Sequence, residues 1–389
     1  MFSTANFKTK TIFTKRKNED VDGIWAIALD IGYSAVKGFS NNSVFCFPSY
    51  ARKITSQILS FDNTQSNDIQ YRDDETNEIW AVGSSAQDMI VSGEARDSIM
   101  ELYGRNRYFS EIFKVITRVG MGIGMLNDEY GYSSRKKIML QTGLPPAYLR
   151  SDTALLKDAL SGLHKFSIKF GNQEWVSFNF VLPMENIFVM PQPMGTLLSV
   201  STDNKGKQIQ DAVKYFKSSV LIFDPGFGTL DVFNMRNSLI ESTETFDNLG
   251  MKRVLEETIN LILAKYQQEI SIPEMQKYLL TGQIKCHNRK NRSTSMVSFA
   301  DLLSDANKKT CYEALSKIDN IYNGLYDHDY LIITGGTGAA WNEIIRDYYK
   351  DMKTLKIVSG NQNDNLPYIF SNVRGYYLYL VNKLKKENL

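Results

Sequence analysis

The fold is decided by residues 220–233, which read VLIFDPGFGTLDVF. The stretch opens with a continuous apolar run, as expected for a strand that is buried on both faces. Asp224 ends this strand, and Gly226 and Gly228 allow the backbone to turn sharply and to approach a ligand closely. A carboxylate at a strand end, beside a turn rich in N–H donors, suits Mg²⁺ and a chain of phosphates. The stretch therefore predicts a phosphate-binding hairpin.

The N-terminal half of the chain repeats this plan. Residues 24–39 read IWAIALDIGYSAVKGF, which is again an apolar strand followed by Asp30, Gly32 and the hydroxyl residue Ser34. One such hairpin alone is equally typical of a simple β-turn. Two of them, one in each half of the chain, predict two similar domains that hold one nucleotide from opposite sides.

Composition narrows the class of protein. The length of 389 residues favours two or more domains, and 43% hydrophobic residues is ordinary for a globular protein. A net charge of +2 gives no general attraction to nucleic acid or to an anionic membrane, so direct binding of either is not expected. No apolar run is long enough to span a bilayer, and the N-terminus lacks the features of a secretory signal. The three cysteines, Cys46, Cys286 and Cys311, show no Cys-x-x-Cys spacing, which favours reduced thiols in a cytoplasmic protein.

Two further stretches carry candidate chemistry. Residues 331–338 read LIITGGTG, an apolar strand that enters a glycine turn, and we expect a helix from about Ala339. This turn lacks the Gly-Lys-Ser/Thr ending of a phosphate loop, but its small residues could lie against an adenine ring and ribose. Residues 187–195 read IFVMPQPMG, a strand that ends in a rigid turn with one polar side chain, Gln192. We expect the chain to cross between its domains near this turn.

Three other segments allow two interpretations each. Residues 1–22 are predicted to be a flexible arm, with a contact arm for a neighbouring subunit as the alternative. Residues 54–78 are polar and rich in turn formers, which indicates a surface insertion. Residues 267–327 are expected to be largely helical and are interrupted by the basic loop 285–292. This loop is interpreted as solvated, the alternative being a contact with DNA or with an acidic partner.

Taken in order, the motifs resemble those of the actin superfamily of ATPases. Asp-x-Gly at 30–32, Gly-Leu-Pro at 143–145, Asp-x-Gly-x-Gly-Thr at 224–229, Gly-Gly-x-Gly at 335–338 and Asn-x-Arg-Gly at 372–375 resemble its phosphate-1, connect-1, phosphate-2, adenosine and connect-2 motifs. Within the superfamily, the chain is most similar to the bacterial plasmid-segregating actins of the ParM and Alp group. The resemblance covers about residues 24–380.

The resemblance implies an α/β, actin-like (ribonuclease H-like) fold in which two similar domains flank a nucleotide cleft. Domain I would comprise residues 23–190 and 365–389, with a small insertion subdomain at about 45–100. Domain II would comprise residues 191–364, with a helical insertion subdomain at about 247–325. Two departures stand out: Pro225 and Phe227 replace smaller residues, and Pro225 lacks a backbone N–H that could bind phosphate. Plasmid actins often carry Glu at the position of Gln192, which affects the expected rate of hydrolysis.

The resemblance also implies a role for each motif residue. Asp30 and Asp224 would hold Mg²⁺, mostly through water. The outer phosphates would be cradled from one side by Gly32, Tyr33 and Ser34, and from the other by Gly226, Phe227, Gly228 and Thr229. Lys37 would neutralise phosphate charge, and Gln192 would orient the attacking water with Asp224 nearby. Adenosine would contact Gly335, Gly336 and Thr337.

The function implied by the resemblance is that of a cytoskeletal ATPase. Such a protein forms filaments with ATP or GTP and Mg²⁺, hydrolyses the nucleotide and drives plasmid DNA segregation. Its partners would be further copies of itself and a DNA-binding adaptor protein on the plasmid centromere. A small-molecule kinase of the same fold is the alternative, although no clear carboxylate base for a hydroxyl substrate is found. A scaffold that does not hydrolyse nucleotide is a third class, against which the intact Asp30, Asp224 and glycine turns argue.

Overall fold

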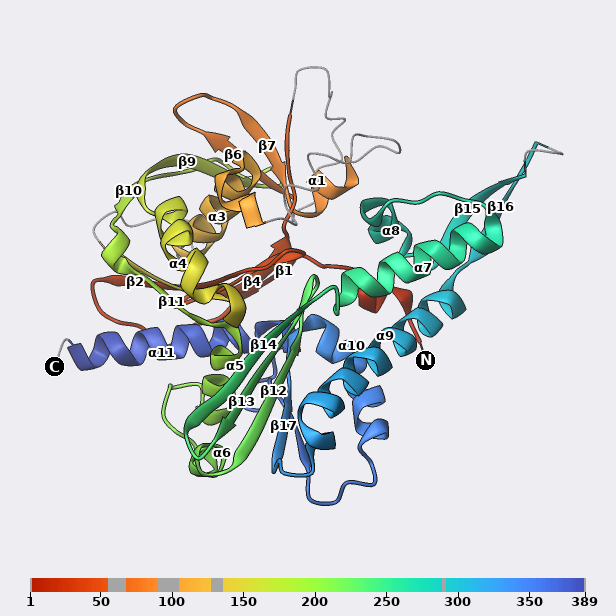
Figure 1. Cartoon of the computed structure of the whole chain (residues 1–389). Coiled ribbons are helices and arrows are strands. Elements are labelled where there is room, and N and C mark those ends of the chain that lie inside the picture. Colours follow the sequence, from red (N-terminus) through yellow and green to blue (C-terminus); the bar gives the residue numbers. More distant parts are fainter. Residues whose placement is uncertain (1, 55–67, 90–104, 127–135, 289–291, 388–389) are drawn as a thin grey trace. The chain divides into compact units, whose positions relative to one another are not determined.

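The computed structural model describes residues 2–54, 68–89, 105–126, 136–288 and 292–387. With these gaps, the chain divides into two compact units. The first unit comprises residues 10–213 and 360–387, and the second comprises residues 2–9 and 214–359 (Figure 1). The sequence placed the domain crossover near residue 190, whereas the units divide after residue 213.

The main sheet of the first unit contains both predicted strands of the first hairpin. Its six strands, in spatial order, are β1 (Ile12–Lys15), β4 (Ser43–Pro48), β3 (Ala35–Ser40), β2 (Ile24–Ile31), β8 (Lys137–Leu144) and β11 (Ile187–Pro191). The strands from β1 to β2 pair in antiparallel fashion, and β8 and β11 follow β2 in parallel. The carboxyl ends of β2 and β11 therefore meet at the same edge of the sheet.

The main sheet of the second unit repeats this plan. Its five strands, in spatial order, are β14 (Leu239–Asp247), β13 (Thr229–Arg236), β12 (Ser219–Pro225), β17 (Tyr330–Ile333) and β18 (Lys356–Ser359). The first three pair in antiparallel fashion, and β17 and β18 follow β12 in parallel. The β4–β3–β2–β8–β11 part of the first sheet has the same order and the same directions, so the prediction of two similar domains is confirmed.

The strand β2 shows why a continuous apolar run predicts a strand covered on both sides. Trp25, Ile27 and Leu29 pack into a core with α3 (Glu111–Gly124) and α4 (Pro146–Leu160). The alternate residues of β2 pack into a second core with α11 (Ser371–Glu387), since successive side chains of a strand point to opposite faces. Within the first unit, α3 and α4 lie on one face of the sheet and α11 on the other (Figure 1).

A second sheet of the first unit joins segments that are distant in sequence. Its five strands, in spatial order, are β10 (Val176–Leu182), β9 (Gly162–Phe170), β6 (Ile69–Asp73), β7 (Ile79–Val82) and β5 (Ala51–Lys53). The predicted surface insertion at 54–78 thus contributes β6 to this sheet, while its residues 55–67 lie outside the described residues. Three short helical segments complete the part of the unit used below: α1 (Ser84–Asp88), the 3-10 helix η3 (Arg105–Phe109) and α5 (Gln192–Ser201).

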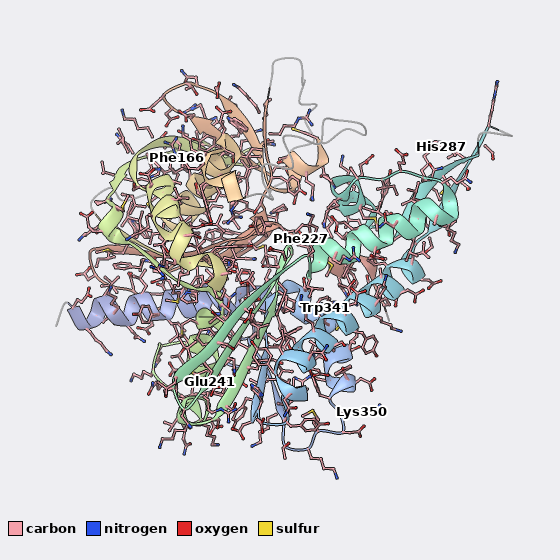
Figure 2. All side chains as sticks on the ribbon, viewed as in Figure 1. Phe166, Phe227, Glu241, His287, Trp341 and Lys350 are labelled. Carbon is pink, nitrogen blue, oxygen red and sulfur yellow. The ribbon has the colours of Figure 1, made fainter. Side chains whose placement is uncertain are left out.

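Helices accompany the main sheet of the second unit, and one of them carries the fully buried Trp341. They are α6 (Ala212–Lys217, at the boundary of the units), α7 (Met251–Tyr266), α8 (Ile272–Tyr278), α9 (Ala300–Ile321) and α10 (Gly335–Tyr348). The fully buried Trp341 of α10 donates a hydrogen bond from Nε1 to Oδ1 of Asn307 on α9, at 2.9 Å (Figure 2). Its ring centroid lies 6.3 Å from that of Phe223 on β12. No helix in the described ranges is long and apolar enough to cross a membrane.

The structure corrects the predicted helical character of residues 267–327. β15 (Gln283–Asn288) and β16 (Ser293–Ser298) pair as an antiparallel hairpin within this range. The part of the predicted basic loop at 285–288 belongs to β15, and His287 lies on this hairpin (Figure 2). Residues 289–291 of the loop lie outside the described residues. In β15 the alternation of Ile284 and Cys286 with polar residues was a short strand signal, whereas β16 is mostly polar and has its two apolar residues, Met296 and Val297, side by side.

The N-terminal segment also differs from the flexible arm that was predicted for residues 1–22. The 3-10 helix η1 (Thr4–Phe7) belongs to the second unit, where the Thr4 hydroxyl donates a 2.7 Å hydrogen bond to the carbonyl of Leu279. Residues 12–15 form β1 and pair with β4 in the first unit. The prediction is therefore wrong for these two segments, because non-local pairing and burial order a stretch that has little local signal.

Candidate nucleotide-binding site

The first hairpin brings together three of the predicted residues. Asp30 ends β2 and is only 5% exposed, and Lys37 lies opposite it on β3. Nζ of Lys37 lies 3.0 Å from Oδ2 of Asp30, and Nε2 of Gln192 donates a hydrogen bond of 3.2 Å to Oδ1. Gln192 is the first residue of α5 and directly follows β11, so the turn expected there is the start of a helix.

The turn of the first hairpin needs glycine at position 32. The Gly32 amide donates to the carbonyl of Ala35 at 3.0 Å, which closes the turn. A Cβ atom on Gly32 would lie 2.9 Å from that carbonyl oxygen and 2.9 Å from Nζ of Lys37. The Ser49 hydroxyl donates to the Gly32 carbonyl at 2.8 Å, and the Ser49 amide donates to the Ser34 carbonyl at 2.9 Å. The backbone of the turn is thus held by Ser49, which directly follows β4, as well as by β3.

Arg107, which no motif of the sequence predicts as a site residue, also contacts this turn. Nη2 of Arg107, in η3, lies 2.6 Å from the carbonyl oxygen of Ile31, and the guanidinium carbon lies 4.6 Å from the centroid of the Tyr33 ring. Arg107 is 76 positions from Ile31 and belongs to no motif. Only tertiary structure shows that it lies at the turn.

The position of Gln192 depends on the packing of α5 against α11. The guanidinium of Arg374 donates hydrogen bonds to the carbonyl oxygens of Ser199, at 2.7 Å, and Thr202, at 3.1 Å. These bonds cap the C-terminal end of α5. A Cβ atom on Gly375 would lie 1.8 Å from the carbonyl oxygen of Gly195. The two helices therefore touch through their backbones, and the connect-2 residues fix the helix that begins with Gln192.

In the second hairpin, Asp224 lies near the end of β12 and is 5% exposed. The Gly226 amide donates to the Thr229 carbonyl at 2.8 Å and closes the turn. The first amides of α7 bind this turn from outside, with Met251 N donating to the Gly226 carbonyl at 3.1 Å and Lys252 N to the Phe227 carbonyl at 2.8 Å. The turn is thus tied to a helix N-terminus, which uses donors that a helix cannot satisfy internally.

The third signature joins this group. Gly335 adopts a φ of +76°, and a Cβ atom there would lie 2.6 Å from Oδ1 of Asp224, so the position requires glycine. The helix α10 begins at Gly335 and not at Ala339 as predicted. Its N-terminus lies beside the Asp224 carboxylate, which the helix dipole stabilises. The Thr337 hydroxyl donates to the Gly226 carbonyl at 2.6 Å.

Asp231 is a second residue that sequence reasoning missed. It faces Asp224 across the β12–β13 pair and is 2% exposed. Its carboxyl accepts hydrogen bonds from the hydroxyls of Thr245 at 2.7 Å and Thr229 at 3.3 Å. Burial, and then the charge of Asp224, raise the pKa of Asp231 to about 8. Its position seven residues after Asp224 on the returning strand was the available signal.

The predicted residues thus form two groups. Asp30, Lys37 and Gln192 are together in the first unit, and Asp224, Gly226 and Thr337 are together in the second. In the described part of the chain, no group of three or more His, Cys, Asp or Glu side chains could hold a metal ion. Mg²⁺ often keeps several waters and takes only one or two carboxylates, so the single buried aspartate near a strand end in each unit is of a kind that suits this ion. The role of Gln192 with Asp224 stays a prediction.

Comparisons with known proteins agree with this architecture. Residues 28–195 match the family model of the N-terminal domain of actin-like proteins. No curated protein sequence matches the chain. A 15-stranded ParM filament from Clostridium botulinum aligns with a TM-score of 0.69 and 21% identity, over 92% of this chain and 98% of that one. An apo ParM from the plasmid pSK41 aligns with a TM-score of 0.62 and 20% identity, over 94% and 100%.

An archaeal actin homologue in complex with ADP also aligns, with a TM-score of 0.57 and 15% identity, over 91% of this chain and 97% of that one. The chain is therefore a protein with the actin-like fold. Residues 28–195 match the N-terminal domain of actin-like proteins, and the whole chain is similar in structure to the ParM proteins. The resemblance inferred from the sequence motifs is confirmed.

Proposed function

We propose that this protein is a filament-forming actin-like ATPase that drives plasmid DNA segregation. One observation carries the proposal: two strands in equivalent places of two similar sheets, β2 and β12, each end in a buried aspartate that a glycine turn follows. In the first unit, Gln192 and Lys37 contact Asp30. In the second unit, the first residue of α10 lies beside Asp224. A fold kept only as a scaffold has no need for two such constellations.

ATP is the proposed substrate, with GTP as the nucleotide to be compared in the same assays. The turn at 32–34 and the turn at 226–229 would supply backbone N–H groups to the phosphates, and the start of α10 would contact the adenosine. Lys37 would bring positive charge to the phosphates. Asp30 and Asp224 would hold Mg²⁺ mostly through water, and this ion would neutralise negative charge on the phosphates.

Gln192 is proposed to orient the attacking water. Its amide nitrogen is held by Asp30, so the side chain is restricted before nucleotide arrives. Its carbonyl oxygen can accept a hydrogen bond from water, whereas a neutral amide is too weak a base to remove the proton fully. Positioning, with stabilisation of developing charge, is the main contribution that phosphoryl transfer needs from a protein.

Self-association is supported by the likeness to a ParM protein seen in a 15-stranded filament and to an Alp12 protein seen in a filament. Head-to-tail contacts that do not close into a ring generate open filaments. ATP would favour the polymer by binding the assembled state more tightly than the free subunit. The proposed cellular partners are other copies of the chain and a DNA-binding adaptor on the plasmid centromere, in the cytoplasm.

Phosphate release from ATP and from GTP, with Mg²⁺ and with EDTA, tests the enzymatic half of this proposal. Turnover should require Mg²⁺ and should rise more steeply than linearly with protein concentration, because assembly stimulates it. The kinase alternative would be favoured by a different result. Turnover would then appear only when a small hydroxyl compound is added, and it would stay strictly proportional to protein concentration.

A further inference from the structure

Arg107 occupies an unusual place for a charged residue outside any motif. It lies in η3, just before α3, and its backbone there is fixed: the Ser110 amide and hydroxyl donate to its carbonyl oxygen at 3.0 and 2.8 Å. Its neighbour Tyr108 is anchored by a 3.3 Å hydrogen bond to Asp152 on α4. The side chain of Arg107 therefore extends from a rigid base towards the first hairpin.

The guanidinium is surrounded by three aromatic rings. Its central carbon lies 4.6 Å from the ring centroid of Tyr33, 5.4 Å from that of Phe113 and 5.7 Å from that of Tyr108. Each distance is within the range of a cation–π interaction. Only the Tyr33 ring belongs to the turn that would bind phosphate, so the cation joins this turn to a rigid aromatic support.

The same guanidinium also binds the backbone of the turn. Nη2 donates to the carbonyl oxygen of Ile31 at 2.6 Å, and Ile31 is the residue between Asp30 and Gly32. A planar cation can stack on a ring and donate in its own plane at once, which an ammonium group cannot do. One side chain thus fixes both a peptide group and a ring of the turn.

We propose that Arg107 is a positioning residue for the nucleotide site, which sets the conformation of the 31–34 turn and adds positive charge beside it. The inference rests on the proposed function, since the turn matters only if it binds phosphate. Loss of Arg107 leaves Ser49 to brace the turn, but removes the cation from the Tyr33 ring and a donor from the Ile31 carbonyl. Nucleotide affinity should then fall, because part of the binding energy is spent on ordering the turn.

The first comparison uses a matched arginine. Arg72 in the second sheet of the first unit also stacks on a ring, with its guanidinium carbon 4.8 Å from Trp175, and it donates to Asp74 at 2.9 Å. Arg72→Ala therefore removes an arginine–aromatic pair of the same kind without touching the turn. Arg107→Ala should weaken the binding of a fluorescent ATP analogue with Mg²⁺ about tenfold or more, given the strength of a charged hydrogen bond and a cation–π pair. Arg72→Ala should leave this affinity within about twofold.

The second comparison separates positioning from charge and from folding. Arg107→Lys keeps the charge and should still lose several-fold in affinity, with a melting temperature close to that of the wild type. Tyr33→Leu should weaken binding as well, and the double variant Tyr33→Leu with Arg107→Lys should lose less than the two single losses combined, because the residues act as one pair.

The outcomes are distinct. If the wild type binds no nucleotide, the proposed function fails and this inference fails with it. If the wild type binds nucleotide, and Arg107→Ala and Arg107→Lys both bind it as tightly as the wild type does, only the inference is overturned. It is also overturned if Arg72→Ala weakens binding as much as Arg107→Ala does, or if the Tyr33 and Arg107 effects are fully additive.

Discussion

Gln192 and Asp30 are 162 positions apart in sequence and are joined by a 3.2 Å hydrogen bond from the amide Nε2 to the carboxylate Oδ1. The two residues lie at the same edge of one sheet, since Asp30 is the penultimate residue of β2 and Gln192 directly follows β11, with β8 between the two strands. A polar residue at the start of α5 is thereby held at the carboxylate that was predicted to serve the metal. This contact supports the view that the start of α5 serves the reaction.

Gln192→Ala should slow ATP hydrolysis by roughly 10- to 1000-fold, the range seen when a single positioning or charge-stabilising group is removed. Nucleotide affinity should change little, because no phosphate-binding donor is lost. Phosphate release under single-turnover conditions measures the rate, and titration with a fluorescent nucleotide measures the affinity. The exposed Gln173 of the same unit provides the control variant Gln173→Ala. Equal rates for the two variants would remove Gln192 from the mechanism.

Asp224→Asn should abolish turnover while the fold is retained. The amide keeps the shape of the side chain beside Gly335, but it removes the charge that Mg²⁺ requires. Asp319→Asn is a suitable control, because Asp319 is in the same unit and accepts hydrogen bonds from Tyr348 and Tyr349 on its surface. Circular dichroism would verify folding in both variants. Turnover at the wild-type rate in Asp224→Asn would show that this aspartate is not the metal residue.

The protonation of Asp231 predicts a pH dependence of stability. Its pKa is raised from 3.8 to about 8, so the folded protein keeps a proton that the unfolded chain releases above about pH 4. The unfolded state then binds fewer protons than the folded state, and the free energy of unfolding falls as pH rises from about 4 to 8. Above the folded pKa this contribution is lost completely.

The variant Asp231→Asn isolates this contribution, because asparagine cannot ionise. Urea unfolding of the wild type and the variant at pH 5 and pH 8 measures it. The loss of stability between the two pH values should be smaller in Asp231→Asn than in the wild type. An identical loss in both proteins would show that Asp231 is ionised in the folded state throughout.

Gly375→Ala should destabilise the first unit by about 1–3 kcal/mol, as overpacking of a tight contact does. Alanine favours a helix interior over glycine by roughly 1 kcal/mol. The added methyl group would, however, lie 1.8 Å from the Gly195 carbonyl oxygen, which is backbone and cannot rotate away. The clash therefore outweighs the helix propensity. Lys386→Ala, at an exposed site of the same helix, is the control for denaturant unfolding, and a more stable Gly375→Ala variant would contradict the packing described for α5 and α11.

Much of the core of this fold was predictable because its signals are local. The strands β2, β12 and β17 are short apolar runs that end in Asp or a glycine turn, and this order identifies the sheet, the hairpins and the carboxylates. Gly335 could be recognised as a turn glycine, although the helix starts four residues earlier than the sequence suggested. The local sequence pattern does not show that Gly335, which has no side chain, leaves room for the carboxylate of Asp224.

The elements and site residues that could not be predicted from the sequence depend on non-local contacts. The strand β1 is only four residues long, and it is ordered by its pairing with β4 and by the packing of Ile12 and Phe13 against the two cores. In the hairpin of β15 and β16, only the short alternation of Ile284 and Cys286 with polar residues indicates a strand. Arg107 contacts Ile31 and Tyr33, which are distant from it in sequence. Asp231 accepts a hydrogen bond from Thr245, which lies on the next strand. No spacing rule predicts the contacts of Arg107, and for Asp231 the only signal was its place seven residues after Asp224 on the returning strand.

Polymerisation controlled by nucleotide is the central claim, and light scattering over a range of protein concentrations tests it most directly. With ATP and Mg²⁺ the signal should rise above a critical concentration and then decay as the nucleotide is consumed, and Gln192→Ala should prolong the plateau without lowering its height. Pelleting of the same samples would verify that the scattering comes from polymer. Protein that stays monomeric at every concentration, with ATP, GTP, ADP or no nucleotide, would contradict the account.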